Sequence, residues 1–234
     1  MYLSLVMAYY DNPTMLRKQY ETIAEYSNAT KDAMEYIVVD DGSPRWPARD
    51  VPRPEGLPKF SLFRIKKDVP WNQDAARNIG VHHSLGKWLL LTDMDHLVPL
   101  ETMQHIMLVK LNKKIAYTFQ RMTLPGWTPY KDHPNSWLMR RSLYEEVGGY
   151  DESLAGYYGT DGEFRTRLMK RAPIASLLRP IIRVPREVIP DASTTTYQRK
   201  NPADKVAIGA IIAQRAFNPK WRPKRLSFKY ERVV

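Results

Sequence analysis

Short apolar runs alternate with amphipathic segments along the first hundred residues. Four apolar runs have the length of strands, and they lie at 2–8, 36–39, 60–65 and 88–92. Apolar positions recur at helical spacing in the segments 13–27 and 72–81. Because strands that alternate with helices pair in parallel through crossover connections, this order predicts an α/β fold. We expect a mostly parallel central sheet with helices on both faces.

The second half of the chain has a weaker form of the same pattern. It predicts a strand at 115–120 and helices near 100–111, 141–147, 164–171 and 206–217. Residues 174–188 form a broken apolar segment, in which Pro180 and Pro185 favour one or two edge strands. Five prolines between 44 and 59 predict a connection without regular structure.

Acidic pairs follow two of the predicted strands directly. Asp40 and Asp41 end the second strand, and Asp93 and Asp95 follow the run 88–92. Ligands bind at the carboxyl ends of strands in an open α/β sheet, so Asp93 and Asp95 are expected at a ligand site. Carboxylates this close repel each other unless a cation neutralises them, and their hard oxygens suit Mg²⁺ or Mn²⁺ shared with a substrate phosphate. A solvated turn is the alternative interpretation of Asp93 and Asp95.

Composition limits the class of protein. A chain of 234 residues can bury one sizeable core, and no apolar run approaches the roughly 20 residues of a membrane helix. Cysteine is absent, which excludes disulfides, thiolate zinc sites and cysteine nucleophiles. The first residues lack a basic leader and are typical of a strand, so a cytoplasmic location is the default expectation.

The net charge of +11 comes from the second half of the chain. Residues 1–100 carry 12 Lys and Arg against 13 Asp and Glu, whereas residues 101–234 carry 24 against 12. This asymmetry indicates a polyanionic partner or an anionic membrane surface. Cationic and aromatic side chains also alternate through 220–230, a pattern typical of nucleic-acid surfaces.

Four motifs occur in an order that resembles the nucleotide-sugar-dependent glycosyltransferases of the GT-A fold, closest to family 2. The first motif is the first strand with its turn, and the second is Val39-Asp40-Asp41-Gly42-Ser43. The third is Ala76-Arg77-Asn78-Ile79-Gly80 followed by Leu91-Thr92-Asp93-Met94-Asp95. The fourth runs from Arg140-Arg141 through Gly148-Gly149-Tyr150-Asp151-Glu152 to Gly159-Thr160-Asp161-Gly162-Glu163-Phe164. The resemblance implies a core at 1–172, with a nucleotide-sugar half at 1–96 and an acceptor half at 97–172. Residues 173–234 would be a basic C-terminal extension packed on or flanking that core.

The resemblance also implies roles for single residues. The nucleotide or its diphosphate would contact Asp11, Asp40, Asp41, Arg77 and Asp93. Asp95 would ligate Mn²⁺ or Mg²⁺ directly, while Asp93 would reach the metal through water or contact the ribose. Asp161 would be the catalytic carboxylate, although Thr160 stands where the family usually has an acid.

A further metal ligand, commonly a late histidine, is frequent in the family. No histidine follows His133 in this chain, so His96, Asp191 or water stay open as alternatives. His133 itself lies between Asp132 and Pro134, and a histidine in such a loop is expected at the surface.

The implied reaction is metal-dependent transfer of a sugar from a nucleotide diphosphate sugar, most simply a UDP-sugar, to a hydroxyl. In-line attack would invert the anomeric centre. The leading hypothesis for the acceptor is a hydroxylated base of modified DNA, flipped out and held by Trp127 and Tyr130 while Arg222, Lys224 and Arg225 contact phosphates.

Three alternatives stay open. One alternative acceptor is a lipid-linked or cell-surface saccharide, reached through peripheral membrane contact. A nucleotidyltransferase would normally need a glycine- and lysine-rich phosphate loop, which residues 9–13 lack. A non-catalytic nucleic-acid-binding protein would not need all four motif acids.

Overall fold

The computed structural model describes residues 1–131, 133–193, 204–216, 218 and 220–234. Its strands are β1 (Leu3–Tyr9), β2 (Met34–Asp40), β3 (Lys59–Ile65), β4 (Trp88–Asp93), β5 (His96–Leu97), β6 (Ala116–Thr123), β7 (Thr128–Tyr130), β8 (Trp137–Arg140), β9 (Ile174–Arg183) and β10 (Tyr230–Arg232). Its helices are α1 (Pro13–Ala24), α2 (Asn28–Ala33), α3 (Gln73–His83), α4 (Leu100–Leu108), α5 (Arg141–Val147), α6 (Asp161–Met169) and α8 (Asp204–Ala216), with single 3₁₀ turns at Ala48–Asp50 and Glu152–Leu154.

One sheet organises the described part of the chain. The strand order is β10-β3-β2-β1-β4-β8-β6-β9-β5, and β7 pairs with β6 outside this path. The four strands from β3 to β4 are parallel, as are β6 and β9, while β8 runs antiparallel to both of its neighbours. The predicted α/β fold with a central, largely parallel sheet is confirmed.

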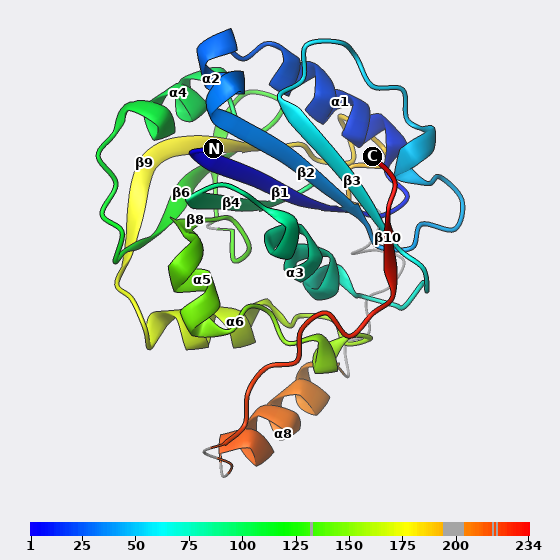
Figure 1. Ribbon diagram of the computed structural model, residues 1–234, viewed down its shortest axis with the longest axis vertical. Helices are drawn as coiled ribbons and strands as arrows, with labels where there is room; N and C mark the ends of the chain where they lie inside the picture. Colours follow the sequence, from blue (N-terminus) through cyan, green and yellow to red (C-terminus); the bar gives the residue numbers. More distant parts are fainter. Residues whose placement is uncertain (132, 194–203, 217, 219) are drawn as a thin grey trace.

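Helices cover both faces of the sheet (Figure 1). Successive side chains of a strand point to opposite faces, so on β1 Leu5 and Met7 enter one core and Val6 enters the other. Helices α1 and α4 pack with the first core, and α3, α5 and α6 pack with the second. Because β1 is covered on both sides, its sequence is apolar at nearly every position rather than alternating, and the buried Ser4 donates its hydroxyl to Glu35.

The central parallel strands bring two strand ends together. In the register of the sheet, Tyr9 lies opposite Asp40, and Ala8 lies opposite Asp93. The acidic residues after β2 and β4 therefore emerge at the same edge of the sheet, on either side of β1.

Two segments differ from the predictions. No strand was predicted before the helix at 141–147, but the segment there forms β8 in the middle of the sheet, where Leu138 is fully buried. One or two edge strands were expected within 174–188, but β9 pairs with β6 on one side and with β5 on the other. The ladder between β6 and β9 shifts register between Thr118 and Gln120, next to Pro180, which has no amide proton to donate.

The C-terminal segment returns to the sheet. Helix α8 lies below the rest of the molecule in Figure 1, and the chain then runs back past α6 and α3 to the sheet edge. There β10 pairs with β3, and Val233 donates its backbone N–H to the carbonyl of Leu62. Strands from both sides of the predicted boundary at residue 172 thus belong to one sheet.

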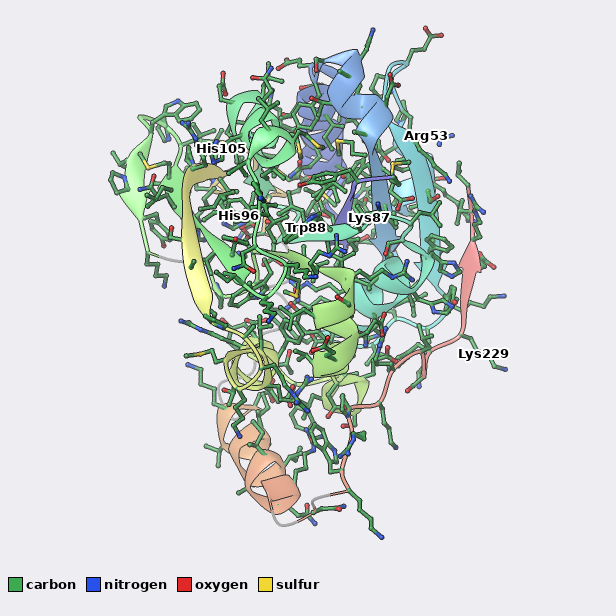
Figure 2. All side chains as sticks on the ribbon, turned by 60° about the vertical axis from the view of Figure 1, so that its left-hand side comes forward. Arg53, Lys87, Trp88, His96, His105 and Lys229 are labelled. Atoms are coloured by element: carbon green, nitrogen blue, oxygen red, sulfur yellow. The ribbon has the colours of Figure 1, made fainter. Side chains whose placement is uncertain are left out.

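Two buried acids hold the returning C-terminal segment in place. Asp151 accepts a hydrogen bond from the backbone of Lys224 at 3.0 Å, and Glu152 accepts from the backbones of Leu226 and Ser227 at 2.7 and 2.6 Å. The segment exposes other side chains, among them Lys229, to solvent (Figure 2). Within the described residues, no helix is both long and apolar enough to cross a membrane.

Candidate active site

A cavity of about 390 Å³ opens at the carboxyl ends of β1 and β4. It is lined by residues from both halves of the chain: Ala8, Tyr9, Tyr10, Asn12, Asp41, Trp71, Gln73, Asp93, Met94, Asp95, Arg121, Tyr130, Lys131, His133, Pro134, Asn135, Tyr158, Asp161, Arg183, Ala192 and Ser193. Of the residues singled out in the sequence, it therefore unites Asp41, Asp93, Asp95, Asp161 and Tyr130.

Asp93 is held from below by a buried arginine. The guanidinium of Arg77, which is fully buried on α3, forms a short salt bridge with one Asp93 oxygen. Nε2 of His133 lies 3.2 Å from the other oxygen. Burial opposes ionisation, but Arg77 and then His133 hold the pKa of Asp93 well below its usual range. Asp93 is therefore a carboxylate whose charge is offset inside the protein.

Asp95 has weaker partners and faces the cavity. Nδ1 of His96 lies 2.8 Å from one oxygen, and the Ser193 hydroxyl donates to the other at 3.0 Å. His96 is fully buried beside β9 (Figure 2). Burial raises the pKa of Asp95, but His96 outweighs it, and the pKa lies below its usual value. Asp95 can offer charged oxygens to a ligand in the cavity.

The expectation that His133 is a surface residue is wrong. Its side chain is 9% exposed, and its ring lies 4.0 Å from that of His96 between the centroids. Its Nδ1 contacts the Ser136 hydroxyl at 2.8 Å. The loop folds inward because these contacts satisfy both ring nitrogens, which the local sequence beside a proline does not reveal. Nearness to the acidic pair could be found only in three dimensions.

The residues left open as further metal ligands have other partners. Asp191 accepts hydrogen bonds from the backbones of Thr14 and Met15 at 2.7 and 3.1 Å, and so satisfies the first turn of α1. His96 is engaged with Asp95. Across the described residues, no group of three or more His, Asp or Glu side chains forms a complete metal site.

Asp161 is the first residue of α6, not the cap that precedes it. The side-chain amide of Gln73 donates to it at 3.4 Å, and its carboxyl group faces the same cavity as Asp93. Burial raises the pKa of Asp161, and the charge of Arg77 only partly opposes this. A carboxylate with a raised pKa at a cavity wall is suited to accept a proton near neutral pH.

Asn78 ties the loop before α6 to α3. Its amide donates to the Tyr150 carbonyl at 2.9 Å and to Glu152 at 2.8 Å, and its carbonyl accepts from Tyr144 at 2.6 Å. Gly149 also packs against it, with a left-handed φ of +68° and too little space for a Cβ. The motif Arg77-Asn78 thus supports both Asp93 and the loop that leads to Asp161.

Asp11 and Asp40 lie outside the cavity lining. Asp40 accepts from the backbones of Ser43 and Ala48 at 2.7 and 2.9 Å and pairs with Arg64 at 2.8 Å. Asp11 accepts from the backbones at 45 and 46, at 3.2 and 2.9 Å. Both acids order the loop after β2, which leaves Asp41 as the member of its pair that faces the cavity. Their predicted contact with the nucleotide stays a prediction.

The residues assigned to the acceptor are dispersed. Tyr130 lines the cavity, whereas Trp127 is 56% exposed and does not. Arg225 pairs with Glu145 of α5, and Arg222 and Lys224 lie on the same returning segment, away from the cavity lining. Basic composition was visible in the sequence, but its position relative to the cavity was not.

The sheet topology and this cavity define a GT-A glycosyltransferase. The model of the family described as glycosyl transferase family 2 matches residues 4–158. The chain belongs to glycosyl transferase family 2 and is a glycosyltransferase, as the motifs predicted. A search of curated proteins found no match.

Solved structures share the fold at low identity. TarS of S. aureus in complex with UDP-GlcNAc has a TM-score of 0.75 at 14% identity, over 95% of this chain and 68% of TarS 1–349. GalNAc-T7 with UDP, GalNAc and Mn²⁺ has a TM-score of 0.63 at 15% identity, over 79% and 44%. The mannosyltransferase PcManGT of Pyrobaculum calidifontis, with GDP-Man and Mn²⁺, has a TM-score of 0.62 at 13% identity, over 93% and 81%.

Proposed function

We propose that this glycosyltransferase takes its sugar from a nucleoside diphosphate sugar and transfers it to an acceptor hydroxyl with inversion of the anomeric centre. A UDP-sugar is the leading candidate for the donor. The observation that carries the proposal is the convergence of Asp41, Asp93, Asp95 and Asp161 on one cavity. The neighbours with UDP-GlcNAc, UDP and GDP-Man support a nucleotide donor. We place the nucleotide over Asp41 and the diphosphate toward Asp95.

Asp95 and Asp93 fit a divalent cation whose other ligands come from the donor. Their side chains remain 17% and 25% exposed, on the side of the cavity. Mg²⁺ and Mn²⁺ commonly bind one or two carboxylates together with substrate phosphates and water, so two carboxylates are sufficient. When bound, the cation would supply Lewis-acid stabilisation of the leaving diphosphate.

Asp161 is proposed as the general base. An acceptor hydroxyl is a weak nucleophile at neutral pH, and a carboxylate within hydrogen-bond reach can remove its proton as the bond to the sugar forms. Gln73 holds Asp161 from α3, and Asn78 fixes the preceding loop, so both position the base without touching the substrate.

The acceptor is proposed only as a hydroxyl compound. The hypothesis of a hydroxylated DNA base relied on Trp127 and Tyr130 and on the basic residues at 222–225. Of these residues, Tyr130 lines the cavity and the others do not. A lipid-linked or cell-surface saccharide stays an alternative. Duplex DNA therefore enters the test as one acceptor among several.

The proposal is tested by incubation with Mn²⁺, a panel of labelled sugar nucleotides and three acceptor classes. These are duplex DNA with or without hydroxymethylated bases, lipid-linked saccharides and free saccharides. We expect transfer from one donor that requires Mn²⁺ or Mg²⁺. Asp50→Asn, a change at an exposed acid beside Arg49, is the control for Asp95→Asn and Asp161→Asn. Undiminished transfer by Asp95→Asn in EDTA would exclude the metal role.

A further inference from the structure

A cationic wall lies in the cavity beside the acidic pair. It consists of Arg121 on β6, Arg183 on β9 and Lys131 after β7, and all three line the cavity. Tyr130 lies opposite Arg121 in the β6–β7 ladder, and Arg183 lies opposite Thr123 in the β6–β9 ladder. The sheet itself therefore gathers these side chains around β6.

The three cations lie around the ring of Tyr130. The guanidinium carbons of Arg121 and Arg183 lie 4.7 and 5.0 Å from its centroid, and Nζ of Lys131 lies 6.0 Å from it. Cation–π attraction to one ring stabilises each cation, but it does not remove the repulsion between them. The arrangement keeps like charges close to each other.

Carboxylate partners are missing from this wall across the described residues: neither arginine forms a salt bridge there. Arg121 is 8% exposed and donates one hydrogen bond, at 3.2 Å, to the Lys131 carbonyl, while its Nε has no partner. Arg183 donates to the Thr123 hydroxyl at 3.3 Å. Burial, and the charge of Arg183, lower the pKa of Arg121 although Asp95 opposes the shift. A buried arginine without a carboxylate partner is costly unless a ligand supplies one.

We propose that Arg121 and Arg183 bind an anionic group of the acceptor, a phosphate or a carboxylate. The fork of an arginine matches either group with two parallel hydrogen bonds. The inference rests on the proposed function, in which a divalent cation at Asp95 offsets the charge of the donor diphosphate. The donor diphosphate then does not require the positive charge of Arg121, Lys131 and Arg183. That charge fits a second anion. The acceptor of this enzyme is accordingly an anionic hydroxyl compound.

The test uses small compounds that share a hydroxyl and differ in charge. Glycerol 3-phosphate, glycerate and glycerol are titrated by NMR into the full chain saturated with UDP and Mg²⁺. Arg183→Gln and Arg183→Lys are compared with Arg179→Gln, a control on the exposed side of the same strand. The dissociation constant of UDP is measured for every variant, and melting temperatures identify any variant that does not fold. If Arg183→Gln fails to fold, Arg183→Lys, which keeps the positive charge but lacks the guanidinium fork, serves as the test variant.

We expect at least one anion to bind about tenfold or more tightly than glycerol, and Arg183→Gln to remove that difference. The lysine variant should keep part of it, and the control and the UDP affinity should not change. Anions that bind no better than glycerol would overturn the proposal. Equal losses of UDP and anion affinity would overturn it as well, because the wall would then bind the donor diphosphate. If UDP itself did not bind, the proposed function would fail, and the same titration without UDP would still test the arginines.

Discussion

Two regions, one behind the acidic pair and one in the cavity lining, use buried arginine in opposite ways. Arg77 lies beneath the acidic pair, with 0% exposure, in contact with Asp93, with Asp74 at 3.6 Å and with the ring of Tyr150 at 5.1 Å. Arg121 lies in the cavity lining with another arginine for a neighbour and no carboxylate in salt-bridge range among the described residues. The first charge is neutralised within the protein, so it stabilises the fold and orients Asp93. The second is left for a ligand.

Removal of the two arginines should separate these roles most clearly. Arg77→Leu leaves Asp93 and Asp74 without their buried partner, so we expect a loss of about 3–5 kcal/mol in the free energy of unfolding. Arg121→Leu removes an uncompensated charge and should change that free energy by less than about 1 kcal/mol. Urea denaturation monitored by circular dichroism measures both. Equal losses in the two variants would contradict the distinction.

The acidic pair should be the next most sensitive position. Asp95→Asn removes a charged metal ligand but almost no volume, so transfer should fall about 10²–10³-fold with the fold intact. The rate is measured with saturating Mn²⁺, and Asp50→Asn is expected to keep the wild-type rate. A rate of Asp95→Asn near that of the control would remove Asp95 from the metal site.

Asp161→Asn should lower kcat by about 10²-fold while the affinity for the donor stays unchanged. Because burial raises the pKa of Asp161, the wild-type kcat/KM should fall as the pH drops through that raised value and the carboxylate gains a proton. The variant should lack this acidic limb. Lost donor affinity with an unchanged kcat would make Asp161 a binding residue.

Asp74 tests the electrostatic cost of the Arg77 network. Burial raises the pKa of Asp74 to about 7 although Arg77 opposes the shift. A carboxyl group whose pKa is raised by folding stabilises the fold when it is protonated. This contribution is complete below the pKa of the unfolded state, 3.8, and is lost as the pH rises through the folded pKa of about 7. Relative to the wild type, Asp74→Asn should therefore gain about 2 kcal/mol of stability between pH 5 and pH 8. A difference that does not vary with pH would show that Arg77 keeps Asp74 ionised throughout.

The smallest effect is expected on the returning basic segment. Arg225 is already paired with Glu145, so a polyanion would meet mainly the exposed Arg222 and Lys224. If duplex DNA binds there, Arg222→Ala with Lys224→Ala should flatten the log–log salt dependence by about 0.9 for each lost phosphate contact. The hydrolysis of the sugar nucleotide should not change. Fluorescence anisotropy at several salt concentrations measures the slope, and an unchanged slope would exclude this segment as a DNA contact.

Much of this protein could be predicted from the local pattern of its sequence. The apolar runs gave β1, β2, β3 and β4 nearly at their observed bounds, because strands covered on both faces are continuously apolar. Asp93 and Asp95 were found since they follow such a run at once, and parallel strands put their carboxyl ends at one edge. Family 2 membership followed from the order of four motifs.

Tertiary structure alone decided the rest, because contacts between distant segments leave no local pattern. β8 has only four residues, and its place between β4 and β6 depends on pairing with both. His133 meets Asp93 across 40 positions of sequence, and Arg121 meets Arg183 only because β6 and β9 are neighbours in the sheet. The sequence determined the fold class and the acidic residues of the site. Packing determined which charges are neutralised inside the protein and which face the cavity.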